Sequence, residues 1–461
     1  MNALKSRFEA VRRTLREDGA LKSVLKNTGW LTGSGGIIIV LSTIQGMLTA
    51  RLLGVAVWGT LAIAMSFSAV FAKLLSFRMN DFVIKWVTQL TEDGSQRGST
   101  AFKAALIGDV GSALIAFVLV ELLAGWGAVA FAKNADFATV FRLTGLIILF
   151  QAGRETLLGI LQVHRDFRVM SVVPVICQAV TVGGVVVVFA VGWGLYAVVA
   201  VLVAGEAVAA SLYWGFGARA ANAVLEHGWV RSKLVRLGEL EREMWHFALL
   251  TNVSGTLKLV QNEGDVLILG FLSNPTYVAY YKLARSIAEV VYLPMMPLVT
   301  ATYPDISSSA AGARWDEFRR LLRHGTTVAA AWFVPASLGT MLLAPFAIRI
   351  LYGKSFVPAA PVLDMLLIGV ALNGIVFWTG SALLSLGEAA YVARNSLEVA
   401  GVKIVLAVLL VPTWGAMAMA FSATAALSAM NILAARRVYK VLRMRESAAL
   451  PGDVAEDAAG S

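Results

Sequence analysis

The sequence predicts an all-α polytopic membrane protein of about twelve transmembrane helices, arranged as two lobes of six. Hydrophobic residues make up 58% of the 461 residues and charged residues only 15%, whereas about a quarter of a soluble domain is charged. Long apolar stretches recur from about residue 29 to about residue 438. Segments of this length cross a bilayer as helices, because a helix satisfies its own backbone hydrogen bonds in lipid.

Each predicted span is long enough to cross the hydrocarbon layer. The spans cover residues 29–53, 57–77, 101–131, 137–163, 169–191, 193–216, 246–271, 275–303, 326–351, 357–384, 388–411 and 413–438. Pro294 and Pro297 predict a kink in the eighth span.

The domain boundaries follow from the polar stretches between the spans. Residues 1–28 carry seven basic residues before a span too long for a signal-peptide core. We expect a cytoplasmic amphipathic helix there, with a frayed basic tail as the alternative. The predicted domains after it are an N-lobe (29–216), a cytoplasmic linker (217–245), a C-lobe (246–438) and a disordered cytoplasmic tail (439–461). Faint self-similarity after the first and seventh spans supports a duplicated transporter.

The distribution of basic residues predicts the orientation. Of the 39 Lys and Arg residues, thirty fall on the side of the two termini, five on the other side and four inside helices. Because positive residues are concentrated in cytoplasmic loops, both ends of the chain are expected in the cytoplasm.

Several functional classes have no support in the sequence. The chain has one cysteine, Cys177, four dispersed histidines, no phosphate-binding GxxxxGK[ST] loop and no nucleophile motif. The net charge of +10 comes from residues that flank spans, which fits a membrane surface and not nucleic acid. We therefore expect no enzyme activity, no metal and no cofactor, with coupling to a proton or sodium gradient as an option.

Charged residues occur in the middle of the eighth span. Lys282 and Glu289 point almost the same way on a helix, and Arg285 lies within about 60° of them. One charge at the centre of a bilayer costs roughly 2.5–3.5 kcal/mol. Such a stripe indicates a water-filled cavity, and the alternative is mutual neutralisation inside the helix bundle.

The seventh span repeats this pattern, with Lys258, Gln261, Asn262 and Asp265 on one face. Neutralisation would then pair Lys282 or Arg285 with Asp265 or Glu289.

The N-lobe offers fewer polar groups within its spans. Gln45 lies in the first span, and Arg78 and Asp81 lie near the inner end of the second. Glu121, Glu206 and Asp364 are candidate proton-linked acids, although such residues more often mark a helix end or a satisfied ion pair.

Four stretches resemble bacterial polysaccharide and O-antigen flippases of the multidrug/oligosaccharidyl-lipid/polysaccharide (MOP) superfamily. The segment ARLLGVAVWGTLAIAMSF (50–67) is similar to their AR-x-LG-x3-[YW]G motif, and LQVHRDFRVMSVV (161–173) to their basic inner turn. Residues 264–307, ending in YPDIS, resemble their seventh and eighth spans, and LYGKSFVPAAPVLDML (351–366) resembles their ninth-to-tenth junction.

This resemblance implies two six-helix lobes around a central cavity, with alternating access. It implies that undecaprenyl-pyrophosphate-linked oligosaccharide moves from the cytoplasmic to the periplasmic leaflet of the bacterial inner membrane. Related lipid II flippases hold pyrophosphate with arginines, of which Arg285 matches one position and Arg78 loosely matches another. Their first-helix arginines are missing here, where Gln45 and apolar residues stand, which favours a different headgroup.

The predicted cavity residues are Arg285, Lys282, Lys258, Asn262, Gln261, Arg78 and Gln45, and the candidate ion-coupling residues are Asp265 and Glu289. The expected partners are the lipid-linked oligosaccharide, membrane lipids, and a polysaccharide polymerase with its export machinery. The protein itself is expected to be a monomer. Two alternatives stay open: a multidrug extruder of the same superfamily, and a membrane polysaccharide polymerase or ligase. A drug extruder would need acidic cavity residues, and a polymerase a large outer loop.

Overall fold

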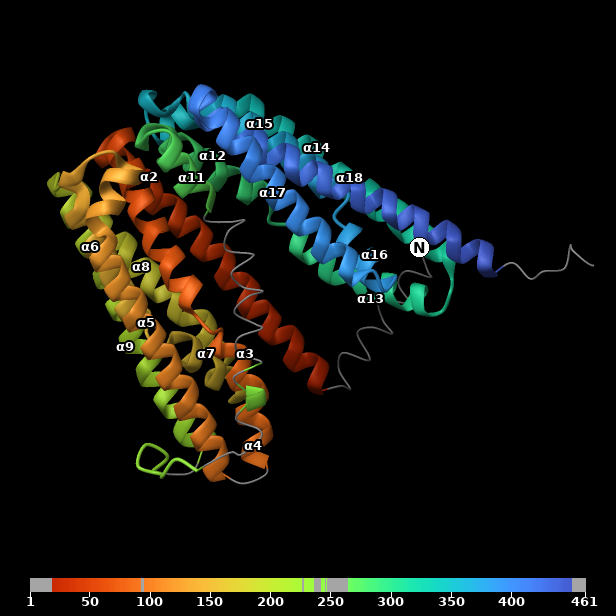
Figure 1. The fold of residues 1–461 in the computed structure, drawn as a ribbon, viewed down its shortest axis with the longest axis horizontal. Helices are drawn as coiled ribbons and strands as arrows, with labels where there is room; N and C mark the ends of the chain where they lie inside the picture. Colours follow the sequence, from red (N-terminus) through yellow and green to blue (C-terminus); the bar gives the residue numbers. More distant parts are fainter. Residues whose placement is uncertain are drawn as a thin grey trace, which may run out of the picture. The chain divides into compact units, whose positions relative to one another are not determined.

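The computed structural model describes residues 19–92, 95–225, 228–235, 242–244, 246 and 264–449, with side chains for those between 33 and 445 except residues 92 and 95. The chain divides into two compact units, Met1–Leu267 and Ile268–Ser461, called the first and second units here. The described residues of both are helical and contain no strand (Figure 1).

Up to residue 225, the described part of the first unit contains ten elements. They are α2 (Gly19–Leu75), α3 (Met79–Phe82), the π-helix η1 (Val83–Val87), α4 (Thr88–Glu92), α5 (Ser95–Ala132), the 3-10 turn η2 (Ala135–Phe137), α6 (Ala138–Gln151), α7 (Arg154–Val163), α8 (Phe167–Val191) and α9 (Leu195–Val224). Within this unit α8 packs against α2 and α9, and α6 against α5 and α9.

The second unit repeats the long-helix pattern. Helix α11 (Gly264–Leu272) contains the boundary between the units, and the elements after it are α12 (Pro275–Tyr292), α13 (Met295–Ala311), α14 (Trp315–Leu351), η3 (Lys354–Phe356), α15 (Ala359–Ile375), α16 (Thr379–Ser385), α17 (Ala389–Trp414) and α18 (Ala416–Ala449). Here α15 packs against α12, α14 and α18.

The number of spans stays a prediction. Nine helices in the described part are long and apolar enough to cross a membrane, or ten if the bent pair α12 and α13 counts as one span. One of the nine, Gly33–Thr91, contains both the first and second predicted spans, which meet at a kink at Gly54 (φ 72°). Figure 1 shows the chain doubling back there, from red to orange. Most of the seventh predicted span, 246–271, lies outside the described residues.

Four predicted spans are broken, at corresponding places in the two units. Non-helical residues follow Leu75 in the second span and Gln151 in the fourth, and breaks follow Tyr292 in the eighth and Ile375 in the tenth. The eighth span bends by 41° at Leu293–Pro294, as its prolines predict, and Pro297 falls in the first turn of α13, where its missing N–H has no cost. Matching breaks in spans 2 and 8 and in spans 4 and 10 support an internal duplication.

The predicted linker, 217–245, differs from the structure at its start. Helix α9 continues to Val224, and Leu225 and Trp229 are buried in the core of the first unit. The Lys103 amine donates to the Ser232 carbonyl oxygen at 2.6 Å. Because apolar side chains of this segment are buried in the core, the chain up to residue 235 belongs to the first unit and is not a free linker.

The predicted disordered tail, 439–461, is wrong for its first part. Helix α18 runs to Ala449, with Val441 and Leu442 buried. The Arg445 Nη2 donates to the Leu386 carbonyl oxygen at 2.7 Å, so this end of α18 is held against the end of α16. Residues 450–461 lie outside the described residues. The same is true of residues 1–18, which form most of the predicted amphipathic segment 1–28.

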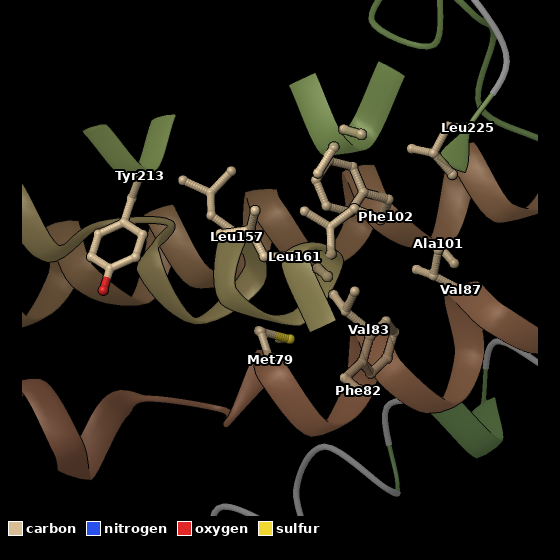
Figure 2. Close-up of a cluster of buried hydrophobic side chains, with 14 of the residues drawn as sticks. Met79, Phe82, Val83, Val87, Ala101, Phe102, Leu157, Leu161, Tyr213 and Leu225 are labelled. Carbon is tan, nitrogen blue, oxygen red and sulfur yellow. The ribbon is translucent and has the colours of Figure 1, made fainter. Parts of the chain in front are cut away.

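The core of the first unit gathers around the broken second and fourth spans. Figure 2 shows Phe82 and Val83, from α3 and η1, near Phe102 of α5 and Leu161 of α7. A Cβ added at Gly159 of α7 would lie 2.7 Å from the Val83 Cβ, so α7 and the π-helix touch where a glycine permits it. This packing fixes α7, whose first residue is the central group of the site below.

Candidate functional site

A cavity of about 310 Å³ lies inside the first unit. It is lined by Ile38, Gln45, Met65, Ile147, Arg154, Pro174, Cys177, Gln178, Thr181, Leu202, Gly205, Glu206, Ala209 and Tyr213. Gln178 and Glu206 lie more than ten residues from either end of α8 and α9, which places the cavity halfway along these spans. Charged and amide groups at this depth are costly unless they are paired or functional.

The break between α6 and α7 brings a cation to the cavity. Gly153 has φ 79°, a conformation that glycine adopts without strain, and a Cβ there would lie 2.9 Å from the Trp214 Cζ2 atom. Helix α7 begins directly afterwards, so Arg154 is its first residue.

An acid from another helix caps the start of α7. Because the N-cap residue Gly153 has no side chain, the Asp109 Oδ2 atom on α5 takes its place. It accepts hydrogen bonds from the Thr156 backbone N–H (2.9 Å) and hydroxyl (3.0 Å). Both side chains are buried. This contact stabilises the broken helix end and thereby positions Arg154.

Arg154 forms an ion pair with Glu206 of α9 through its Nη2 atom. Its guanidinium carbon lies 5.5 Å from the centroid of the Tyr213 ring, within the range of a cation–π contact. The Nε atom is buried and has no hydrogen-bond partner among the described residues. Glu206 therefore neutralises the cation but uses only part of its donor set.

Two glutamines complete the polar lining. The Gln178 Nε2 donates to the Gln45 Oε1 at 2.7 Å, joining α8 to α2. A glutamine amide carries two donor hydrogens and an acceptor oxygen, so this pair has capacity for further hydrogen bonds. The cavity thus offers one neutralised cation, one carboxylate, amides and an aromatic ring. Among the described residues no three His, Cys, Asp or Glu side chains are placed to hold a metal ion.

Sequence reasoning missed Arg154. The charge count assigns it to the cytoplasmic side, although it lies within the predicted span 137–163. The signal that could have found it is the Gly-Arg-Glu step in that span, since a glycine before a charged pair marks a helix break. The sequence offered two interpretations of Glu206, a proton-linked acid or a member of an ion pair. In the structure it forms an ion pair with Arg154.

In the second unit, α12 carries Lys282, Arg285 and Glu289. The Arg285 Nε donates to the Glu289 Oε1 at 2.8 Å, the neutralisation that was the alternative to a cavity. The Glu289 side chain is nevertheless 63% exposed and that of Arg285 23%. The packed face of α12 is formed instead by apolar residues such as Val278, Leu283 and Ala284.

Arg78 does not line the cavity. It occupies the break after α2, with φ 48°, and pairs with Asp81 at 3.0 Å. Glu155, the second residue of α7, interacts electrostatically with both.

The remaining predicted site residues concern the seventh span. Asp265 is buried in the first turn of α11. Lys258, Gln261 and Asn262 lie outside the described residues. The roles predicted for all of these side chains stay predictions.

Solved structures share this fold. A lipid II flippase, MurJ, in an inward closed conformation matches with a TM-score of 0.72 and 13% identity, over 89% of this chain and 88% of that one. An inward-facing multidrug resistance transporter of the MATE family, from the MOP superfamily, matches with a TM-score of 0.66 and 12% identity, over 88% and 96%.

The match to one relative by sequence covers a smaller part of the chain. A probable flippase, AglR, from Haloferax volcanii is 25% identical over 183 residues. The match spans 39% of this chain and 38% of the relative.

The apolar helices, the broken spans and the shared fold define a multi-pass membrane protein with the fold seen in MurJ and in MATE-family transporters. Residues 48–361 match the model of the family described as "Polysaccharide biosynthesis protein". The chain belongs to this family, and the prediction of a polysaccharide flippase family is confirmed.

Proposed function

We propose that the protein is a flippase for oligosaccharide linked to undecaprenyl pyrophosphate, which it moves from the cytoplasmic to the periplasmic leaflet by alternating access. The observation that carries the proposal is the polar cavity with Arg154 halfway along the spans of the first unit. A glycan cannot cross hydrocarbon unaided, because its hydroxyl groups would lose their hydrogen bonds. The likeness to MurJ and the family membership support this function.

The proposal treats the protein as a transporter without covalent turnover. The cavity presents an arginine, a carboxylate and amides, and none of these is paired as a nucleophile with a base. A multidrug extruder would favour an acid available to cationic drugs, whereas Glu206 is already paired with Arg154. The proposal includes a monomer in the bacterial inner membrane, both termini in the cytoplasm, coupling to a proton or sodium gradient, and cooperation with a polymerase and export machinery.

Deletion of the gene in its host is expected to trap lipid-linked oligosaccharide on the inner leaflet and to reduce surface glycan. The physical reason is that the polar headgroup would lose its hydrogen bonds to water if it crossed the hydrocarbon layer unaided. The measurement is the fraction of lipid-linked sugar that an impermeant lectin or oxidant reaches in spheroplasts. Purified protein that polymerised or cleaved this intermediate would overturn the proposal.

The single cysteine permits a direct test of orientation. In a Cys177→Ala background, Lys233→Cys is expected to resist a membrane-impermeant maleimide in intact cells, and Ala135→Cys to react. Both positions are exposed, and they lie on opposite sides by the charge count. Labelling of both variants after permeabilisation is the control. Reaction of Lys233→Cys in intact cells would reverse the proposed orientation.

A further inference from the structure

The ion pair between Arg154 and Glu206 uses one nitrogen of the guanidinium. Another Arg–Glu pair in the chain shows the contrast: the Arg437 Nε and Nη2 atoms both donate to the Glu388 carboxylate, at 3.0–3.2 Å. Arg154 uses Nη2, and its Nε has no partner among the described residues. A guanidinium binds a carboxylate best through two nitrogens, so Arg154 has capacity for a better-placed carboxylate.

The charge of the cavity limits the ligands that fit. Arg154 and Glu206 are the only Arg, Lys, Asp and Glu side chains in the described lining, and their charges cancel. A diphosphate would add two or more negative charges to a site with one cation at low dielectric. A single carboxylate adds one, and Glu206 shows that Arg154 accepts a carboxylate here.

The rest of the lining suits a sugar ring. The amides of Gln45 and Gln178 can donate to and accept from hydroxyl groups, and Tyr213 presents an aromatic ring beside the guanidinium. A volume of about 310 Å³ is at the lower end for ligand pockets, which span roughly 300–1,000 Å³. A volume of this size suits one sugar residue.

We propose that this cavity is a subsite for one acidic sugar of the transported glycan, whose carboxylate binds Arg154 in place of Glu206, while the displaced Glu206 takes up a proton from water so that the site stays neutral. Glu206 is then a tethered competitor that neutralises Arg154 while the subsite is empty. The inference rests on the proposed function and deepens it, because it assigns the cargo to glycans that contain a uronic-acid type of residue.

The variants must remove the charge without leaving one partner unpaired. Loss of either residue alone would strand the other charge in the cavity and could unfold the protein. The double variant Arg154→Gln with Glu206→Gln keeps similar shape and neutral overall charge. The matched control is Arg437→Gln with Glu388→Gln, which removes a comparable pair in the second unit.

The binding test uses full-length protein in detergent micelles and saturation-transfer NMR. Methyl glucuronide is expected to bind, and methyl glucoside, which lacks the carboxylate, to bind roughly 10- to 100-fold more weakly, as for loss of a charge-assisted hydrogen bond. The Arg154/Glu206 double variant should lose this preference and the control double variant should keep it. Inorganic pyrophosphate should not displace the glucuronide.

Three results would overturn the inference: equal binding of the two glycosides, a preference that persists in the Arg154/Glu206 variant, or displacement by pyrophosphate, which would assign the cavity to the carrier. A separate assay keeps the proposed function distinguishable. In proteoliposomes, the protein should translocate polyprenyl-diphosphate disaccharides. If translocation failed while the preference for glucuronide remained, the flippase function would be refuted and the sugar subsite would not. If translocation succeeded without a preference for glucuronide, only the subsite would be refuted.

Discussion

Replacing Arg285 with alanine is expected to abolish surface glycan while membrane abundance stays nearly normal. The Glu289 side chain, which pairs with Arg285, is 63% exposed, so loss of this pair leaves Glu289 in contact with solvent. Exposed pairs contribute about 0–1 kcal/mol, too little to reduce abundance. Export should fail because the contact to the pyrophosphate of the cargo that the family resemblance predicts for Arg285 is lost. Arg285→Lys should restore export only partly, since a point charge cannot reproduce the two-nitrogen contact.

The control is Arg394→Ala on α17, where Arg394 pairs with Glu398 at the same i,i+4 spacing and both side chains are more than half exposed. This variant should export glycan normally. The measurements are immunoblots of membranes and surface glycan staining of the same cells. Normal export by well-expressed Arg285→Ala protein would refute the binding role. A fall in abundance that Glu289→Gln reverses would make the pair structural.

Replacing Asp109 with alanine is expected to lower the free energy of unfolding by roughly 2–4 kcal/mol, from two buried donors that lose their acceptor. These donors are the backbone N–H and the hydroxyl of Thr156, at the start of α7. Because this contact positions Arg154, export should fall as well. Asp109→Asn keeps an acceptor oxygen and should lose less stability. The measurement is the thermal unfolding midpoint of the detergent-solubilised protein.

Ser112→Ala is the matched control for Asp109. Ser112 is also buried on α5, but its hydroxyl donates to the Asp109 carbonyl oxygen within the same helix. Its loss should change the midpoint much less. Equal midpoints for Asp109→Ala and the natural protein would show that α7 begins where it does without this cap.

Much of the architecture could be predicted from the sequence because it depends on local composition. Apolar runs predicted the membrane class and most helices, and Pro294 predicted the bend in the eighth span. Predictions failed where contacts between distant parts of the chain decide whether a segment is helical. The helix α18 extends past residue 438 because Val441 and Leu442 find a buried place, and polar composition alone had suggested a tail.

The candidate site depended on contacts between helices distant in sequence. Helical periodicity places residues on a face of one helix, but it does not say which faces meet. Gln45 meets Gln178 across 133 residues, Arg154 meets Glu206 across 52, and Asp109 meets Thr156 across 47. By itself the sequence determined a helical membrane protein and predicted that its basic residues gather on one side of the membrane. Only the tertiary structure decided which charges share a cavity, because pairing inside a lobe depends on how its helices pack.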